Sequence, residues 1–471
     1  MGMTADLPPI TGVTGGVAGL TATYAAMLAL ADRFAAAAGG LRDRARADLG
    51  ILVDPDLVES APLSPVTFAE AEARVLDASS GIHGALETSA LFEADALLVR
   101  ATVTAYQECD GLVAGSLGVL DASLGQAAGY AVRSAAPVLL PLGLAVVPAW
   151  RHLPARTRAR LAGDVDEALE EWVDEHPETV QHALDGSGGF LDGVLGLPPT
   201  HRGVADAASG VAALYPPEGE PQVRRRDDLA TPLADSPPGD LTGLLRHLDQ
   251  TNALSTPDRP GDQGTIEVQT LRAHEGTVRH IVYLPGTDQI ATTPWSPDAQ
   301  ARDLPADLHA MAGEHSTYAA GIEEAMSRAG IGPHDPVLLV GHSLGGMEAA
   351  SLLSQGSGFH VTHVVTAGSP IAEIRGYPAG SHVLSLENRA DVVPLLDGHR
   401  NADSVQQVTV QFDDHAATAV AGHGLRHYVR GAAAVDASCD PSVREQLASL
   451  HVHGFLGSGG HATSQVFQIV R

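Results

Sequence analysis

The residues best suited to chemistry surround Ser343, which stands at the centre of a Gly-x-Ser-x-Gly motif formed with Gly341 and Gly345. An apolar run at 337–340 precedes the motif, and a stretch rich in Ala and Leu follows it. In this context the motif forms a sharp turn from a strand into a helix, so the serine hydroxyl projects above the sheet. Small flanking residues are needed because strand and helix approach closely there. The pattern predicts a serine nucleophile for acyl transfer.

Such a serine needs a base, and the base needs an acid that orients it. In chains with this motif the order is Ser, then Asp or Glu, then His. Asp391 follows a strand-like run at 382–386, at the strand end where sites form in parallel sheets. His423 lies just before a helical stretch and could reach the serine from a loop. His427, inside that stretch, is the alternative base.

Acyl transfer also needs donors for the developing oxyanion. The main-chain N–H of Leu344, directly after the nucleophile, is the first expected donor. The second is expected in the loop after an earlier strand, 280–284. There Gly286 lets the backbone approach closely, and Thr287 offers both an N–H and a hydroxyl.

The elements that position these residues alternate between short β-like runs and helical stretches. The predicted strands are 266–271, 280–284, 337–340, 363–366 and 382–386, and the predicted helices include 316–328 and 346–354. This alternation predicts a mostly parallel sheet with helices on both faces, which is an α/β architecture.

The first half of the chain has a different pattern. Apolar residues recur at helical spacing over 20–34, over about 65–106 with a break near 79–81, and over 156–173. Long antiparallel helices packed as a bundle are therefore expected. The predicted organisation is an α-helical domain over 1–214, a proline-rich linker over 215–240 and an α/β domain over 241–471.

Composition excludes several function classes. The chain has 57 Asp and Glu but only 28 Lys and Arg, a formal charge of −29, which argues against a nucleic-acid partner. The apolar run 134–150 contains three prolines and predicts a buried or interfacial segment, with no integral membrane span. Cys109 and Cys439 are expected to be unpaired thiols. With no secretory signal visible, the expected location is the cytoplasm, or outside the cell by a non-classical route.

Residues of the second half resemble a known family. The motifs are Leu-Pro-Gly-Thr at 284–287, Gly-His-Ser-Leu-Gly-Gly at 341–346, Asn-x-x-Asp-x-Val-Pro at 388–394 and His-x-Leu-x-x-Tyr at 423–428. Together they resemble the class 3 lipases, α/β-hydrolases that include fungal triacylglycerol lipases and plant phospholipase A1-type enzymes. The resemblance covers about 264–435.

The resemblance implies the α/β-hydrolase fold and a role for each matched residue. Ser343 corresponds to the nucleophile, Asp391 to the acid and His423 to the base, with Thr287 and Leu344 as oxyanion donors. It implies a hydrolase for carboxylic esters of lipase, esterase or phospholipase type. Its substrate would be a lipid or a small ester, and it would need no cofactor or metal. An acyltransferase that uses the same triad stays open.

Two departures from the family and one further resemblance bear on function. Pro285 stands where the family usually has Arg, and the segment 288–313, at the position of the family's lid, is more polar than a lid that binds lipid surfaces. The helical half bears a faint resemblance to actinobacterial WXG-type modules, which implies export or docking to a partner protein. The alternative function is therefore an exported effector or interaction protein. A domain that packs on and shields the catalytic domain is the simpler explanation of the helical half.

Overall fold

The structure is a computed structural model that describes most of the chain. The described residues are 7–152, 177–198, 200, 203–255, 260–273, 276–288, 300–416, 418–457 and 460–471. Residue contacts divide the chain into two compact units, one formed by Leu20–Gly115 and the other by Met1–Gly19 with Ser116–Arg471. This division differs from the predicted helical domain over 1–214, because segments on both sides of Leu20–Gly115 belong to the unit that contains the sheet.

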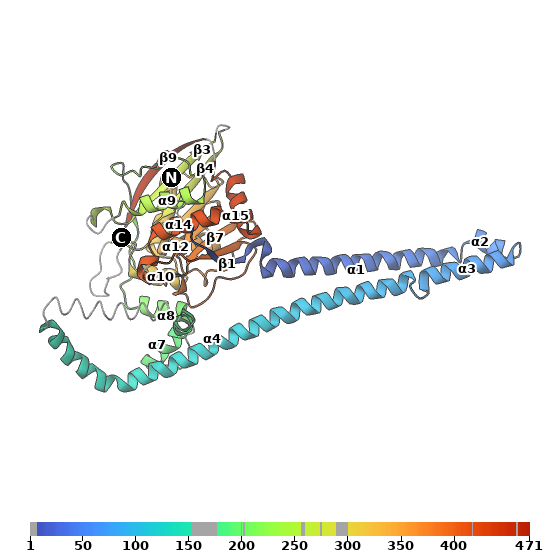
Figure 1. The fold of residues 1–471 in the computed structure, drawn as a ribbon, viewed down its shortest axis with the longest axis horizontal. Helices are drawn as coiled ribbons and strands as arrows, with labels where there is room; N and C mark the ends of the chain where they lie inside the picture. The colour runs from blue at the N-terminus through green and yellow to red at the C-terminus, as the bar shows by residue number, and fades with distance from the viewer. Residues whose placement is uncertain are drawn as a thin grey trace. The chain divides into compact units, whose positions relative to one another are not determined.

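A mixed sheet forms the centre of the larger unit (Figure 1). Its strands are β1 (Ile10–Gly15), β2 (Gln222–Arg225), β3 (Thr265–Arg272), β4 (Val278–Leu284), β5 (Val337–His342), β6 (Val361–Ala367), β7 (His382–Asn388), β8 (Gln407–Phe412) and β9 (His461–Val470). Within the described residues their order is β1-β8-β7-β6-β5-β4-β3-β9-β2. The run from β4 to β8 is parallel, whereas β1 at one edge and β3, β9 and β2 at the other pair antiparallel.

Helices cover both faces of this sheet. They include α9 (Leu241–Asn252), α10 (Leu304–Met311), α11 (Thr317–Arg328), α12 (Leu344–Gln355), α13 (Ala419–Gly422), α14 (Leu425–Asp436) and α15 (Pro441–Val452). Successive side chains of a strand point to opposite faces. Accordingly, Val337 and Leu339 of β5 join a core with residues of α10, α11 and α12, while Leu338 and Val340 join a core with residues of α9, α14 and α15.

The predicted α/β architecture is thus confirmed at the level of layers. All five predicted strands are present, and the helices predicted over 316–328 and 346–354 correspond to α11 and α12. The strands β1, β2, β8 and β9 were not predicted. All four lie at or beside an antiparallel edge of the sheet, and the pairing partners of β1, β2 and β9 are far away in sequence.

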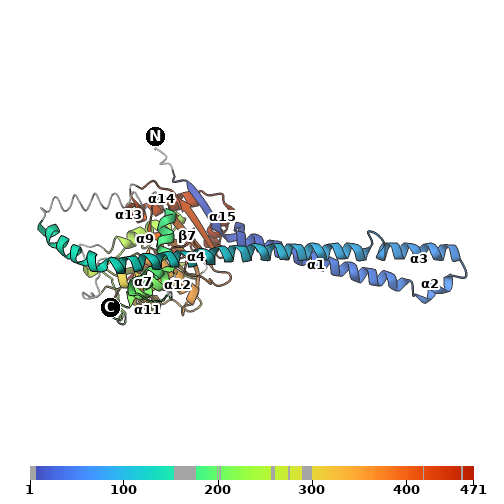
Figure 2. The same ribbon diagram turned by 90° about the horizontal axis from the view of Figure 1, so that it is seen from below.

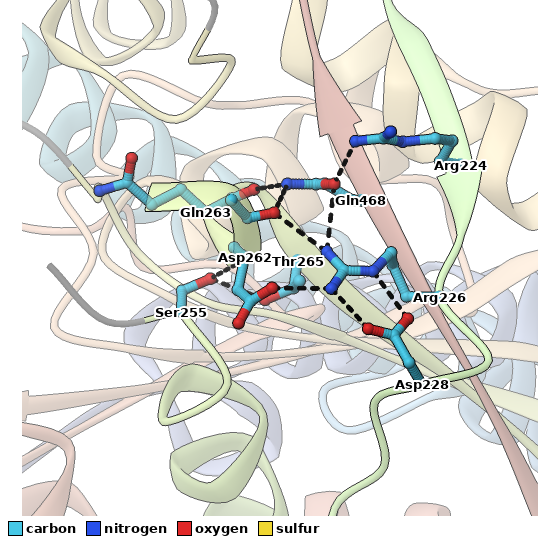
Figure 3. Close-up of polar contacts among 9 residues, drawn as sticks. Arg224, Arg226, Asp228, Ser255, Asp262, Gln263, Thr265 and Gln468 are labelled. Atoms are coloured by element: carbon cyan, nitrogen blue, oxygen red, sulfur yellow. Dashed lines mark hydrogen bonds and ion pairs between the residues drawn. The ribbon is translucent and has the colours of Figure 1, made fainter. Parts of the chain in front are cut away.

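The proline-rich segment 215–240 contributes an edge strand. Within it, β2 pairs with β9, and the next residue, Arg226, fastens the segment to its neighbours (Figure 3). Its guanidinium donates to Asp228 (2.8 Å), to Asp262 (2.7 Å) and to the carbonyl of Gly261 (3.0 Å). A segment anchored by strand pairing and charged hydrogen bonds is ordered, although its composition predicts an extended linker.

The smaller unit is a helical hairpin. It contains α1 (Leu20–Ile51), α2 (Pro55–Ser60), α3 (Pro65–Ser80) and the first part of α4 (Ala85–His152). Figures 1 and 2 both show α1 alongside α3 and α4. Ala31, Ala38 and Ala45, seven residues apart on α1, are fully buried, so one stripe of small residues lets the helices approach. The break predicted near 79–81 separates α3 from α4.

The rest of the predicted helical region is only partly described. The helix predicted over 156–173 lies outside the described residues, and the proline-containing run 134–150 is the last part of α4. Within the described part of the chain, no helix combines the length and apolarity needed to cross a membrane. Cys439 is an exposed free thiol.

Three short helices lie between α4 and β2 in the chain. They are α6 (Pro177–Asp185), α7 (Ser187–Leu195) and α8 (Gly203–Ala212). The helix α7 packs closely on α4, since a Cβ on Gly189 would lie 1.9 Å from the carbonyl oxygen of Ala122. At the end of α6, Asp185 forms an ion pair with His399 (3.0 Å), which lies in the loop that follows β7.

Candidate active site

Ser343 lies in the turn between β5 and α12. Its backbone angles are φ 53° and ψ −123°, a combination that residues other than glycine rarely adopt. Its N–H donates to the carbonyl of Ala367 on β6 (3.1 Å), and its carbonyl accepts from the N–H of Met347 in α12 (3.2 Å). The sheet on one side and the helix on the other therefore hold the serine in a strained conformation.

The two glycines of the motif are required by this packing. A Cβ on Gly341 would lie 2.2 Å from the carbonyl oxygen of Gly345, and a Cβ on Gly345 would lie 2.0 Å from that of Leu284. Both distances are far below van der Waals contact, and both involve backbone atoms that cannot move alone. The strand-to-helix turn closes at this position only because neither residue carries a side chain.

The predicted acid and base form a hydrogen-bonded pair. Asp391 follows β7 and His423 precedes α14, and Nδ1 of His423 lies 2.7 Å from Oδ2 of Asp391. The Asp391 carboxylate is fully buried, whereas the His423 side chain is 22% exposed. A buried carboxylate that binds Nδ1–H leaves the lone pair of Nε2 free to accept a proton.

Two further donors complete the environment of this carboxylate. The Tyr428 hydroxyl donates to Oδ2 of Asp391 at 2.5 Å, and the Val393 N–H donates to Oδ1 at 2.9 Å. Burial, reinforced by the charge of Asp391, raises the pKa of Tyr428 well above its ordinary value of 10, so the phenol stays protonated and remains a donor. Three donors therefore converge on one buried carboxylate and fix its orientation.

His423 is joined to the motif through His342, the residue before Ser343. Nε2 of His342 donates to the main-chain carbonyl of His423 at 2.9 Å, and the centres of the two imidazole rings are 4.4 Å apart. Neither the Ser343 hydroxyl nor Nε2 of His423 has a hydrogen-bond partner among the described residues. Both residues are partly exposed, and a nucleophile–base hydrogen bond often forms only when a substrate binds.

The alternative base, His427, belongs to a separate pair. It lies in α14, where its Nδ1 contacts Oδ2 of Asp414 and its Nε2 accepts from Nε of Arg426 at 3.1 Å. Asp414 also forms an ion pair with Arg430. Because both ring nitrogens of His427 are engaged, the geometry favours His423 as the base.

The loop after β4, which contains Gly286 and Thr287, comes close to Ser343. A Cβ on Gly286 would lie 2.9 Å from Cβ of Ser343, so glycine is needed for this approach. Thr287 follows, but its hydroxyl donates to both carboxylate oxygens of Asp307 in α10 (2.8 and 2.9 Å). Among the described residues, its main-chain N–H has no hydrogen-bond partner. Leu344 is the first residue of α12, so its N–H has no partner within the helix.

Asp307 is unusual for an acid at this position. Desolvation by the surrounding protein raises its pKa to about 7, an effect that the charge of Asp303 increases and the Thr287 hydrogen bond opposes. The protonation of Asp307 therefore changes near neutral pH, directly beneath the oxyanion loop.

Ser343 lines neither of the two larger described cavities. One, of about 810 Å³, borders the acid loop and is lined by Asp391, Arg389 and Arg400 among others. The other, of about 760 Å³, lies between the segment 215–221 and the start of α11. Neither is lined by Ser343 or His423, so neither is assigned to the substrate.

Sequence reasoning brought together Ser343, Asp391 and His423 but assigned no role to His342, Tyr428 or Asp307. The spacing of Tyr428, five residues after His423, carried a signal, because it belongs to the His-x-Leu-x-x-Tyr motif. No local pattern marks Asp307, which reaches Thr287 only through the folded chain.

Among the described residues, His, Cys, Asp and Glu side chains form no group of three or more arranged to hold a metal ion. Comparison of the chain with protein-family models, curated proteins and solved structures finds no match.

Proposed function

We propose that this chain is a serine hydrolase that cleaves carboxylic esters, with an α/β-hydrolase domain of the class 3 lipase type. Ser343 is the nucleophile, His423 the base and Asp391 the acid that orients the base. Leu344 and Thr287 supply main-chain donors for the oxyanion. This chemistry requires no cofactor.

The observation that carries the proposal is the strained turn at Ser343, combined with a carboxylate–imidazole pair that is bonded to the motif through His342. The serine has φ 53° between β5 and α12, and the His423–Asp391 pair is anchored to the motif through His342. A non-glycine residue is kept in such a conformation when its side chain must project from the turn. The chain order Ser, Asp, His also agrees with this fold.

The reaction follows from these positions. Nε2 of His423 accepts the hydroxyl proton as Oγ of Ser343 attacks the ester carbonyl carbon. The main-chain donors stabilise the tetrahedral oxyanion. When the carbon–oxygen bond to the alcohol breaks, His423 returns the proton to the leaving oxygen, which gives an acyl-serine and a free alcohol. Water then attacks the acyl-serine by the same route, and the carboxylic acid is released.

The segment at the lid position favours a short or soluble ester over long-chain fat. Its described parts are tied to the body: Asp288 accepts from the main-chain N–H of Gly264 (2.7 Å), the fully buried Arg302 donates to the Ser255 hydroxyl (2.7 Å), and Asp303 binds Arg471 (2.8 Å). A lid activated at a lipid surface must open and expose an apolar face. Charged hydrogen bonds at residues 288, 302 and 303 oppose such opening.

The test is labelling with a fluorophosphonate probe, wild type against Ser343→Ala. Hydrolysis of p-nitrophenyl esters with acyl chains of two to sixteen carbons is measured in parallel. We expect labelling and turnover in the wild type, loss of both in Ser343→Ala, and a preference for short chains. Folded wild-type protein that neither labels nor turns over any ester contradicts the proposal. Addition of an acceptor alcohol distinguishes hydrolysis from acyl transfer.

A further inference from the structure

His342 occupies the variable position of the Gly-x-Ser-x-Gly motif, where the turn itself places no demand on side-chain chemistry. The residue is nevertheless almost completely buried, at 8% exposure. Burying an imidazole is costly unless its polar atoms are bonded. The contacts that offset this cost therefore indicate what the side chain does.

The His342 ring contacts or approaches three parts of the proposed site: His423, Tyr428 and the loop at Gly286. The His342 ring donates through Nε2 to the carbonyl of His423 at 2.9 Å. It meets the edge of the Tyr428 ring at a centroid distance of 6.0 Å, and Tyr428 in turn binds Asp391. On its other side, Nδ1 lies 3.0 Å from the point that a Cβ on Gly286 would occupy.

The tautomer of His342 follows from its surroundings. Burial, together with the neighbouring His423, holds the pKa of His342 well below its usual value near 6.5, so the ring is neutral. A neutral imidazole carries one N–H, and a carbonyl can only accept, so the proton is on Nε2. A neutral ring also avoids repulsion with the imidazolium that His423 becomes during acyl transfer, at a centroid distance of 4.4 Å.

The bond constrains a different part of His423 than Asp391 does. Asp391 fixes Nδ1 of the ring, while His342 fixes the main chain from which the ring extends. The preceding carbonyl, of Gly422, is held by the amide of Asn388 at 3.1 Å. Two consecutive carbonyls of this loop are thus bound by the side chains of the last residues of β5 and β7, the two strands on either side of β6.

We propose that His342 is a positioning residue, which holds the main chain of His423 so that the His423 ring faces Ser343. This inference rests on the function proposed above. It deepens that function, because it ties the identity of the residue before the nucleophile to the placement of the base.

The test compares His342→Leu, which keeps much of the volume but has no donor, with His342→Gln, whose amide N–H can reach the same carbonyl. For a soluble p-nitrophenyl ester we expect kcat of His342→Leu to fall about 10- to 100-fold with little change in KM, because a small displacement of the base acts on chemistry more than on binding. His342→Gln should recover most of this loss.

His363→Gln is the matched control. His363 is a buried histidine on the neighbouring strand β6, but it lies opposite Leu338, near the end of the sheet remote from Ser343. Its replacement should lower the thermal unfolding temperature while leaving kcat within about twofold. Equal loss of kcat in His342→Gln and His342→Leu, or full kcat in His342→Leu, would overturn the inference.

A second readout does not depend on turnover. The Nδ1–H proton of His423, bound to the Asp391 carboxylate, gives a far-downfield proton resonance. We expect this resonance to broaden or shift in His342→Leu and to return in His342→Gln. If the wild type has no Ser343-dependent activity but the resonance responds in this way, the proposed function fails and the positioning role stands. An unchanged resonance in His342→Leu contradicts the positioning role itself.

Discussion

Two Asp–His pairs follow the strands β7 and β8. They differ in whether Nε2 of the histidine has a hydrogen-bond partner. His423 is bonded to Asp391 through Nδ1 and keeps Nε2 free among the described residues. His427 is bonded to Asp414 and also accepts from Arg426. A histidine can act as a general base only through a nitrogen whose lone pair is available.

This difference predicts unequal effects of matched substitutions. Asp391→Asn should lower kcat by about 10³- to 10⁴-fold, because an amide no longer holds His423 in the tautomer that accepts at Nε2. Asp414→Asn removes the same charge from the other pair and should leave kcat within about tenfold. Both are measured by steady-state ester hydrolysis on folded protein. A larger loss in Asp414→Asn would identify His427 and Asp414 as the functional pair.

At the scale of elements, the site depends on how closely β4, β5 and α12 pack. The first turn of α12 lies against the carbonyl ends of β4, where a Cβ on Gly345 would be 2.0 Å from the oxygen of Leu284. That oxygen cannot retreat without displacing its strand, since β4 pairs with both β3 and β5. The close approach at Gly345 therefore fixes the position of α12 against β4, and with it the turn that holds Ser343.

Gly345→Ala is expected to destabilise the protein by about 3 kcal/mol, the upper range for overpacking, and to abolish ester hydrolysis because the turn reopens. Gly358→Ala is the control, because a Cβ there meets nothing within 4 Å and should change stability by no more than about 0.5 kcal/mol. Denaturant unfolding gives both values. If Gly345→Ala has the unfolding free energy of the wild type, α12 is not packed this closely against β4.

At the scale of the whole molecule, buried ionisable groups at opposite ends of the sheet limit the pH range of stability. His363, at the start of β6, stacks with His382 (4.8 Å) and lies 4.7 Å from His453. Burial, with these two neighbours, lowers its pKa to about 3. Glu348, on the helix that follows the serine, is fully surrounded by protein, and burial raises its pKa to about 8.

The histidine governs the acid side. Between about pH 6.5 and 3 the unfolded chain binds a proton at residue 363 and the folded chain does not, so stability falls as pH falls through this window. His363→Gln should reduce that slope of the unfolding free energy by up to ~1.4 kcal/mol per pH unit. His451→Gln, an exposed change on α15, should leave the slope as it is. An unaltered slope in His363→Gln would contradict this account.

The glutamate governs the alkaline side. Between about pH 4.5 and 8 the folded chain keeps the proton of Glu348 and the unfolded chain has lost it, so stability falls as pH rises. Glu348→Gln mimics the protonated acid and should make the decline shallower, again by up to ~1.4 kcal/mol per pH unit. Glu220→Gln, at an exposed position, serves as the comparison. The prediction fails if both variants decline with the wild-type slope.

Local patterns in the chain were sufficient for the central strands, the turn at Ser343 and the proposal of Ser343, Asp391 and His423 as a triad. Each of these rests on neighbouring residues: an apolar run buried on both faces needs no distant partner to be recognised, and a Gly-x-Ser-x-Gly turn is specified within five positions. The edge strands were missed because their pairing is long-range. β1 pairs with β8 across some 400 residues, and β2 lies in a segment whose prolines indicate a linker.

Only the tertiary structure decided which groups surround the triad. Tyr428 shares an oxygen of Asp391 with His423, Asp307 takes the hydroxyl hydrogen of Thr287, and His342 binds the main chain of the base. Each contact joins residues from different elements, and its existence depends on distances that no local spacing encodes. The sequence by itself thus determined which residue types are available for acyl transfer. The packing of the sheet, its helices and its loops determined their partners, because hydrogen bonds are specific to within a few tenths of an ångström.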